Sequence, residues 1–240
     1  MNFSRRGLLA VAPPALAATI LTSARAETTT DLAVTCDTAV APAVRAAGAA
    51  YRAKTGVRIR VFPTAPGLVL PQLEREIQND IVITQIAVID LAEKEGLVTP
   101  GGRIGPWRNP LVTAAAKQPA GPRDSFAVPD VSPGSDIDGA LILQRIGITP
   151  TTTLGVLDTN AVAWTLLNGG ARLGLLHQTE IAADDRLRAI SPIPDTAWPP
   201  ILYAATATKL ARRGDPAAFL AFLASPNGQS VLHASGLEAA

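Results

Sequence analysis

The stretch LAVTCDTAVAPAV, residues 32–44, holds the transition that decides the fold. Residues 32–35 are a short apolar run typical of a strand, and a break of small polar residues follows them. Apolar positions then recur at helical spacing over residues 41–54, and Gly56 marks the predicted end of that helix. A strand that leads directly into a helix predicts the first unit of an α/β fold.

The alternation of strand and helix continues along the chain. The patterns predict strands over residues 57–62, 80–84, 153–157, 172–177, 187–190 and 201–208, and helices over 68–78, 88–95, 137–146, 160–167, 179–184, 216–224 and 226–234. The β-α-β-α-β order of the first part favours a parallel sheet there. Two α/β lobes joined by crossing segments account for the whole pattern.

Residues 1–26 have the features of an export signal. Arg5 and Arg6 precede an apolar region over residues 8–21, and residues 24–26 (Ala-Arg-Ala) form a small-x-small cleavage site. The motif SRRGLL resembles a twin-arginine signal, which implies export of the folded chain. An ordinary secretory signal that happens to carry two arginines is the alternative. Either route predicts a periplasmic mature chain, and no cysteine beside the cleavage site is there to carry a lipid.

The composition is that of a globular protein, with 48% hydrophobic and 17% charged residues. The formal net charge of +1 includes Arg5, Arg6 and Arg25, so the mature chain carries a charge of about −2. This slightly negative net charge, together with the absence of a dense run of Lys and Arg in the sequence, argues against nucleic-acid binding. Cys36 is the single cysteine, which excludes an intramolecular disulfide and leaves stability to core packing.

No catalytic motif is evident in the sequence. Its serines lie in no G-x-S-x-G elbow, and neither common glycine-rich phosphate loop is present. Asp130, Asp136 and Asp138 lack the spacing of a calcium loop, and Ser135 or Asp136 fits as the cap of the helix over residues 137–146. The sequence therefore predicts that the chain is not an enzyme and holds no cofactor.

Three residues at predicted strand ends have both a ligand-binding and a structural interpretation. Asp37 fits a helix N-cap, but a carboxylate at this place would also repel an anion. Cys36 and His177 suit a soft metal site, whereas a small buried thiol and a satisfied structural histidine are the alternatives.

Several stretches occur in an order typical of one group of transport proteins. They are LAVTCDTAVAPAVRAAGAAYRAKTGVRIRVFPTAPGLVLPQLE (32–74), NDIVITQ (79–85), NPLVTAAAK (109–117), NGGARLGLLHQTEI (168–181), WPPILYAATATK (198–209) and DPAAFLAFLASPNGQSVLHASGL (215–237). With them the chain resembles the periplasmic molybdate-binding proteins of ABC transporters, within the type II solute-binding superfamily. The resemblance covers nearly the whole mature chain.

The resemblance implies a two-lobed Venus-flytrap fold of type II, with mixed sheets flanked by helices. Residues 31–111 and 201–240 would form one lobe, residues 112–200 the other, and the ligand would lie in the cleft between them. The implied function is capture of a small ligand by a monomer for an inner-membrane ABC permease. The alternative is a non-transport role, as a sensor or maturation partner that binds a metal or a small organic ligand.

The resemblance also implies an oxyanion site of neutral donors: hydroxyls after the first two strands, amides at helix starts and a tyrosine on the second lobe. In this sequence the two serines fall at Ala39 and Ala65, and the tyrosine falls at His177. Thr38 and Thr64 can replace the serines, or else the pocket binds an uncharged or cationic solute. The expected cleft residues are Thr35, Cys36, Asp37, Thr38, Thr64, Ala65, Asn160, Ala161 and His177.

Overall fold

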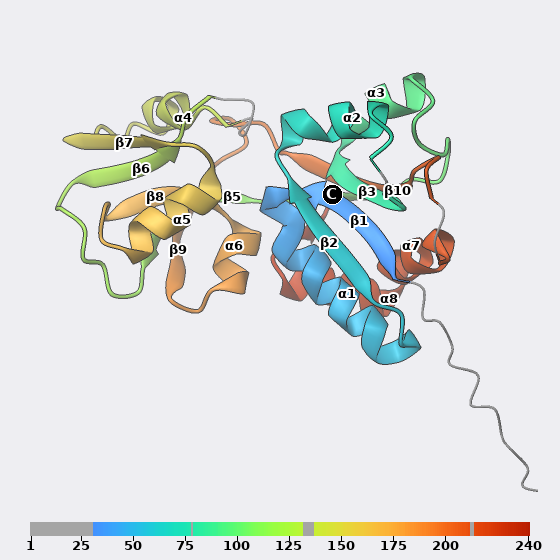
Figure 1. Cartoon of the computed structure of the whole chain (residues 1–240). Coiled ribbons are helices and arrows are strands. Elements are labelled where there is room, and N and C mark those ends of the chain that lie inside the picture. Colours follow the sequence, from blue (N-terminus) through green and yellow to red (C-terminus); the bar gives the residue numbers. More distant parts are fainter. Residues whose placement is uncertain (1–30, 78, 132–136, 212–213) are drawn as a thin grey trace, which may run out of the picture.

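The chain forms two mixed sheets and passes between them twice (Figure 1). The structure is a computed structural model that describes residues 31–77, 79–131, 137–211 and 214–240. We call the first sheet with its helices lobe 1 and the second sheet with its helices lobe 2. Lobe 1 contains β1 (Leu32–Asp37), η1 (Thr38–Val40, a 3-10 helix), α1 (Ala41–Thr55), β2 (Ile59–Thr64), α2 (Pro66–Glu74), β3 (Ile81–Gln85), α3 (Ile86–Lys94), β4 (Ile104–Arg108), β10 (Leu202–Ala207), α7 (Pro216–Ala224), α8 (Pro226–Ala234) and β11 (Glu238–Ala239). Lobe 2 contains β5 (Leu111–Ala116), β6 (Ser125–Pro129), α4 (Gly139–Arg145), β7 (Thr152–Val156), α5 (Thr159–Leu167), β8 (Leu173–His177), α6 (Gln178–Ala183) and β9 (Leu187–Pro192).

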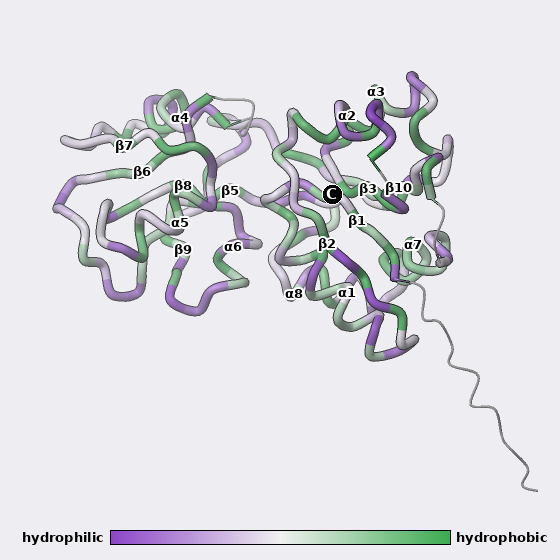
Figure 2. The backbone as a smooth tube through the Cα atoms, viewed as in Figure 1, coloured by the Kyte–Doolittle hydropathy of each residue, from purple (hydrophilic) through white to green (hydrophobic). Residues whose placement is uncertain are grey.

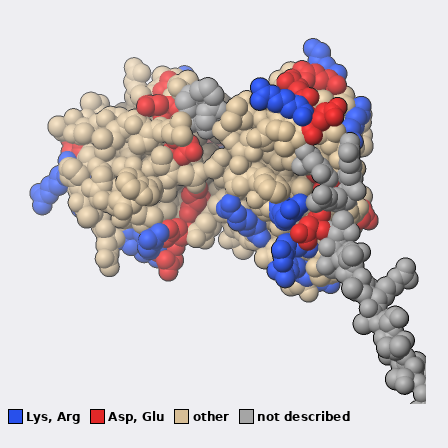
Figure 3. All heavy atoms as spheres, viewed as in Figure 1, with Lys and Arg blue, Asp and Glu red and all other residues tan. Residues whose placement is uncertain are grey.

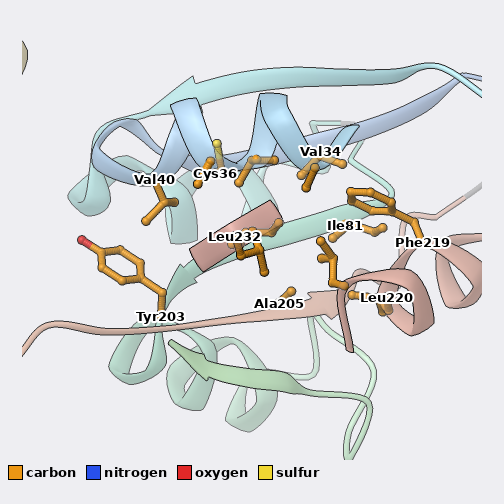
Figure 4. Packing of buried hydrophobic residues seen from close by; sticks show 14 of the residues in the cluster. Val34, Cys36, Val40, Ile81, Tyr203, Ala205, Phe219, Leu220 and Leu232 are labelled. Carbon is orange, nitrogen blue, oxygen red and sulfur yellow. The ribbon is translucent and has the colours of Figure 1, made fainter. Parts of the chain in front are cut away.

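Strand β1 lies inside the lobe 1 sheet, whose order is β11-β4-β10-β3-β1-β2. It pairs in parallel with β2 and β3, and all six of its residues are buried. Val34 and Cys36 point toward the core that α1, α7 and α8 cover, where Val34 lies near Phe219 and Cys36 lies near Val40 (Figure 4). The Tyr51 ring of α1 lies 5.1 Å from the Phe219 ring in an edge-on contact, so aromatic packing joins α1 to α7.

Helices α2 and α3 cover the opposite face of the lobe 1 sheet. Val69 of α2, Val82 of β3 and Ala92 of α3 form a smaller apolar cluster there. Successive residues of a strand point to opposite faces, which is why Val82 joins this cluster while Ile81 and Ile83 join the other. Helices on both faces explain why the central strands are continuous apolar runs.

The lobe 2 sheet has the order β7-β6-β8-β5-β9. β6 pairs in parallel with β7 and β8, and β5 pairs antiparallel with β8 and β9. α5 and α6 cover one face, where Val162 and Leu166 are packed, and α4 covers the other, where Ile142 and Leu143 are packed. In Figure 2 the strands β6 and β8 are largely hydrophobic, and the turns far from lobe 1 are hydrophilic.

Two crossing segments connect the lobes, one between β4 and β5 and one between β9 and β10. Arg108 ends β4, and its guanidinium makes two bonds with the carboxylate of Asp195 in the second crossing segment, at 3.0 and 2.6 Å. This two-bond ion pair ties the two crossing segments to each other.

Candidate functional site

The starts of five helices lie at the carboxyl ends of strands. In lobe 1, η1, α2 and α3 follow β1, β2 and β3, and in lobe 2, α5 and α6 follow β7 and β8. η1 contacts both α5 and α6, so the two edges meet between the lobes (Figure 1). Ligands of open α/β sheets bind at this edge, which makes it the candidate site.

The three helix starts at the lobe 1 edge of the site differ from four other helix starts in how their first turns are capped. Asp138, Asp158, Asp215 and Ser225 cap α4, α5, α7 and α8, and their side chains accept first-turn N–H bonds of 2.8 to 3.2 Å. No side chain among the described residues caps η1, α2 or α3 in this way. First-turn N–H groups have no partner within their helix, so these three starts offer donors to water or to a solute.

A buried hydrogen-bond cluster joins the lobes beside η1. The carbonyl of Ala39 accepts a bond of 2.5 Å from the Thr179 hydroxyl of α6 and one of 3.2 Å from the Asn109 side-chain amide. The same amide donates to the Thr179 hydroxyl at 3.0 Å, and the Thr179 N–H donates to Asn109 Oδ1 at 3.4 Å. Asn109 lies in the first crossing segment, so the cluster connects both lobes and the chain between them.

His177 lies in this junction and is only 2% exposed. Its Nδ1 is 3.3 Å from the main-chain oxygen of Asn109. A carbonyl oxygen can only accept, so Nδ1 carries the proton in this contact. The ring therefore holds the crossing segment, at the position where the resemblance implies a tyrosine donor to the solute.

Glu180 is a buried carboxylate one turn into α6. Its Oε1 accepts a bond of 2.6 Å from the Thr159 hydroxyl at the start of α5, and its Oε2 accepts one of 2.8 Å from the His177 N–H. The pKa of Glu180 is raised to about 7. Burial is the main cause of the rise and the nearby Asp158 charge adds to it, while the two hydrogen bonds oppose it. Glu180 was not among the residues expected from the sequence; its place at the third position of a helix after a strand end is the signal that points to it.

Asp37 ends β1 and is fully buried. Its Oδ1 accepts a bond of 2.8 Å from the Thr84 hydroxyl of β3, and its side chain makes no cap bond to η1. The N-cap interpretation of Asp37 is therefore wrong, because the carboxylate points along the sheet to β3 rather than onto the helix start. Thr38 and Ala39, the next two residues, are partly exposed.

Thr35 and Cys36 lie behind the cleft surface. The Thr35 hydroxyl donates to Asn79 Oδ1 at 2.5 Å, and Thr35 is 1% exposed. Cys36 is a core residue on the α1 side of β1, and burial, followed by the nearby Asp37 charge, raises the pKa of its thiol. In the described part of the chain, no three His, Cys, Asp or Glu side chains come together as metal ligands.

The remaining expected residues lie at the starts of α2 and α5. Thr64 is buried and Ala65 is partly exposed, and the Thr64 hydroxyl is 3.4 Å from Gln72 Oε1. Asn160 is exposed, whereas the N–H of Ala161 is already bonded to Asp158 Oδ1 at 2.8 Å. The structure therefore brings residues 37–39 together with the start of α6, and it leaves Ala161 without a free amide for a solute.

A cavity of about 340 Å³ adjoins the start of α3. Gln85, Ile86 and Ala87 line it from lobe 1, and Trp198 with the two following prolines lines it from the second crossing segment. Residues 85–87 were not among those expected from the sequence. The start of a helix directly after a buried strand is the pattern that could have predicted that they line a cavity.

On the face shown in Figure 3, Lys and Arg side chains gather over α1, and the surface over α5 is largely uncharged. None of the helices in the described residues combines the length and apolar character that crossing a bilayer would need.

Comparison with solved structures shows the same fold at low identity. A periplasmic molybdate-binding protein of Azotobacter vinelandii has a TM-score of 0.70 and 15% identity, over 86% of this chain and 98% of that one. Peb3 from Campylobacter jejuni has a TM-score of 0.63 and 13% identity, over 88% and 100%. Iron-bound HitA from Pseudomonas aeruginosa has a TM-score of 0.57 and 16% identity, over 84% and 83%. These are two-lobed binding proteins, which confirms the predicted fold class.

A sequence comparison with curated proteins gives no significant match. The family model of the bacterial extracellular solute-binding proteins, in contrast, matches residues 32–238. That range includes nearly every described element, from β1 to β11. The chain therefore belongs to the bacterial extracellular solute-binding protein family.

Proposed function

We propose that the chain is a periplasmic binding protein that captures a small oxyanion between its lobes for an ABC importer. The observation that carries the proposal is the set of three lobe 1 helix starts, η1, α2 and α3, that no side chain caps. Helix N-termini complement an anion through backbone N–H groups and the helix dipole, without a buried countercharge.

Neutral groups near these starts support an oxyanion rather than a cation. Thr38 is partly exposed at the start of η1, and its hydroxyl makes no hydrogen bond with the other described residues. In α2, Pro66 has no N–H and Leu68 donates to the Ala65 carbonyl at 2.9 Å, which leaves Gly67 as the first-turn donor. These donors stand close to Ala39 and Ala65, where the resemblance would have serines.

The buried carboxylate of Asp37 is compatible with this proposal. It lies behind the cleft surface and accepts a bond from Thr84, so it is not itself a contact for the solute. Its charge is expected to weaken binding of a dianion without preventing it, since repulsion falls with distance and with the surrounding dielectric. Molybdate is the first solute to test, because the structural neighbour from Azotobacter vinelandii is a molybdate-binding protein.

Thermal unfolding of the chain from Glu27 onward tests the proposal. Molybdate, tungstate, sulfate, phosphate, divalent metals and thiamin would each be added, because a solute that binds only the folded chain raises the unfolding temperature. We expect a rise with at least one tetrahedral oxyanion. Stabilisation by metals or thiamin alone would contradict the solute class, and no stabilisation by any solute would contradict the binding function.

A pair of threonine variants locates the site. Thr38→Val removes a hydroxyl at the start of η1 and should weaken oxyanion binding by about tenfold, the usual effect of losing a hydrogen bond to a charged group. Thr99→Val removes an exposed hydroxyl elsewhere in lobe 1 and should leave binding unchanged. Equal affinities in the two variants would place the solute elsewhere.

A further inference from the structure

A cavity of about 700 Å³ lies on the face of the lobe 2 sheet that α4 covers, away from the interlobe site. Phe126 of β6 and Leu173 of β8 form its floor, and Ile146 and Ile148 line it just beyond the end of α4. Ile190 of β9 lines its other side. None of these residues belongs to the candidate interlobe site.

A second hollow of about 300 Å³ continues the first. It shares Phe126, Ile148 and Leu173 with the larger cavity and reaches Arg172 at its far end. The two together make one groove over the sheet, lined mainly by apolar side chains. Arg145 lines the larger hollow, and Arg172 lines the smaller one together with Asp124, whose carboxylate is bonded to Thr151.

The groove exists because helix cover on this face is incomplete. The opposite face carries both α5 and α6, whereas this face carries only the seven-residue α4 and the start of the second crossing segment. Ile190 is consequently 45% exposed, and Ile146 and Ile148 are only partly buried. Contiguous apolar surface of this kind marks binding sites, and the larger cavity has the volume of a small-molecule site.

Arg145 is the one charged residue that lines the larger cavity. Its Nη1 donates to the Ala197 carbonyl at 3.0 Å, which holds the guanidinium at the rim. Within the described residues, no carboxylate lies at ion-pair distance from it, whereas Arg103, Arg108 and Arg186 each have one. The remaining N–H groups of Arg145 suit a carboxylate, which a guanidinium binds through two parallel bonds.

We propose that this groove is a second ligand site, for a small monocarboxylate with an apolar body such as a medium-chain fatty acid. The carboxylate pairs with Arg145, and the apolar body covers Ile146, Ile148 and Ile190, whose side chains are exposed or partly exposed in the groove. The site is independent of the solute bound between the lobes.

Displacement of a fluorescent probe tests this site in the chain from Glu27 onward. The probe is 1-anilinonaphthalene-8-sulfonate, an apolar anion that fluoresces in apolar cavities, and decanoate is the competitor. We expect decanoate to displace the probe at least tenfold more effectively than decanol or decylamine, which share its body but lack its carboxylate. Equal displacement by all three, or displacement by molybdate, would overturn the proposal.

Two substitutions test the two parts of the groove, the guanidinium of Arg145 and the apolar surface at Ile190. Arg145→Gln should weaken decanoate binding at least tenfold, and Arg145→Lys should restore part of it; Arg52→Gln, an exposed arginine of α1, is the matched control. Ile190→Glu adds a negative charge to the groove and should abolish decanoate binding. Because Ile190 lies at an exposed strand position, we expect the variant to fold. Thermal unfolding of each variant verifies folding. Wild-type affinity in either Arg145→Gln or Ile190→Glu would overturn the assignment.

Discussion

The hydroxyl of Thr179 in lobe 2 donates to the main-chain carbonyl of Ala39 in lobe 1, across 2.5 Å. Thr179 is fully buried and Ala39 is partly buried, and the Asn109 side chain bonds to both groups. Separation of the lobes must break this contact, and the buried groups then need other partners. The structure thus contains a bond between the lobes that does not involve a solute.

Thr179→Val should therefore weaken the contact between the lobes. The variant leaves the Ala39 carbonyl with only the longer Asn109 bond and should lower the free energy of unfolding by about 1–2 kcal/mol. We also expect a larger radius of gyration in small-angle X-ray scattering without solute. Thr165→Val is the control, because the Thr165 hydroxyl donates to the Ala161 carbonyl within α5. A loss of stability in both variants without any change in scattering would mean that the Thr179 bond does not hold the lobes together.

Glu180 should make stability fall as the pH rises. Its pKa is about 7 in the folded chain against a usual value of 4.5, so the folded state holds the extra proton between these two pH values. The free energy of unfolding therefore decreases from about pH 4.5 to pH 7, by about 3 kcal/mol for this group alone.

Glu180→Gln should remove that slope. Urea unfolding of both proteins at several pH values between 4.5 and 8 gives the difference directly, and Glu95→Gln, an exposed residue after α3, controls for the loss of one charge. An identical pH dependence in Glu180→Gln and the wild type would refute the elevated pKa.

Cys36 should be unreactive in the folded chain. It is fully buried, and burial raises the pKa of its thiol, so the reactive thiolate is absent at neutral pH. We expect a thiol reagent such as 5,5′-dithiobis(2-nitrobenzoate) to react only after unfolding in urea. Fast reaction under native conditions would show that Cys36 reaches the cleft after all. Cys36→Ala should leave solute affinity unchanged and cost about 1 kcal/mol of stability through the small cavity that it creates.

Arg5 and Arg6 should be needed for export if the signal is of the twin-arginine type. Replacement of both by lysine keeps the positive charge that a general secretory signal requires, but it destroys the paired-arginine motif. We expect the precursor to accumulate in the cytoplasm, as measured by immunoblot of cell fractions. Undiminished export of the double variant would instead support the ordinary secretory alternative.

The sequence predicted best those elements whose boundaries are marked by local chemistry. α7 and α8 begin and end at the expected residues, because Asp215 and Ser225 cap them and a proline follows each cap. β4 and β6 were missed, since their sequences IGPWR and SFAVP contain prolines that usually argue against a strand. Proline is tolerated at the end of β6 and within β4 because tertiary pairing overrides the local preference.

The site was predicted less completely than the fold. The expectation that residues 35–38 lie at the interlobe edge follows from the rule for strand ends, but that rule does not say which side chains face outward. Thr35 and Cys36 alternate into opposite sides of β1, and both are buried there. Asn109 and Thr179 carry no motif, and only the approach of the two lobes gives them their roles.

The position of β10 between β3 and β4 has a consequence for the order in which the chain can fold during synthesis. All strands of lobe 2 lie within residues 111–192, so the ribosome synthesises them before it makes residues 202–207. Until then the lobe 1 sheet is divided, with β1 to β3 on one side of the gap and β4 on the other. The lobe that contains the first strand is thus the last to be completed. For an export route that accepts only folded chains, this order means that the chain cannot be exported until residues 202–240 have been made.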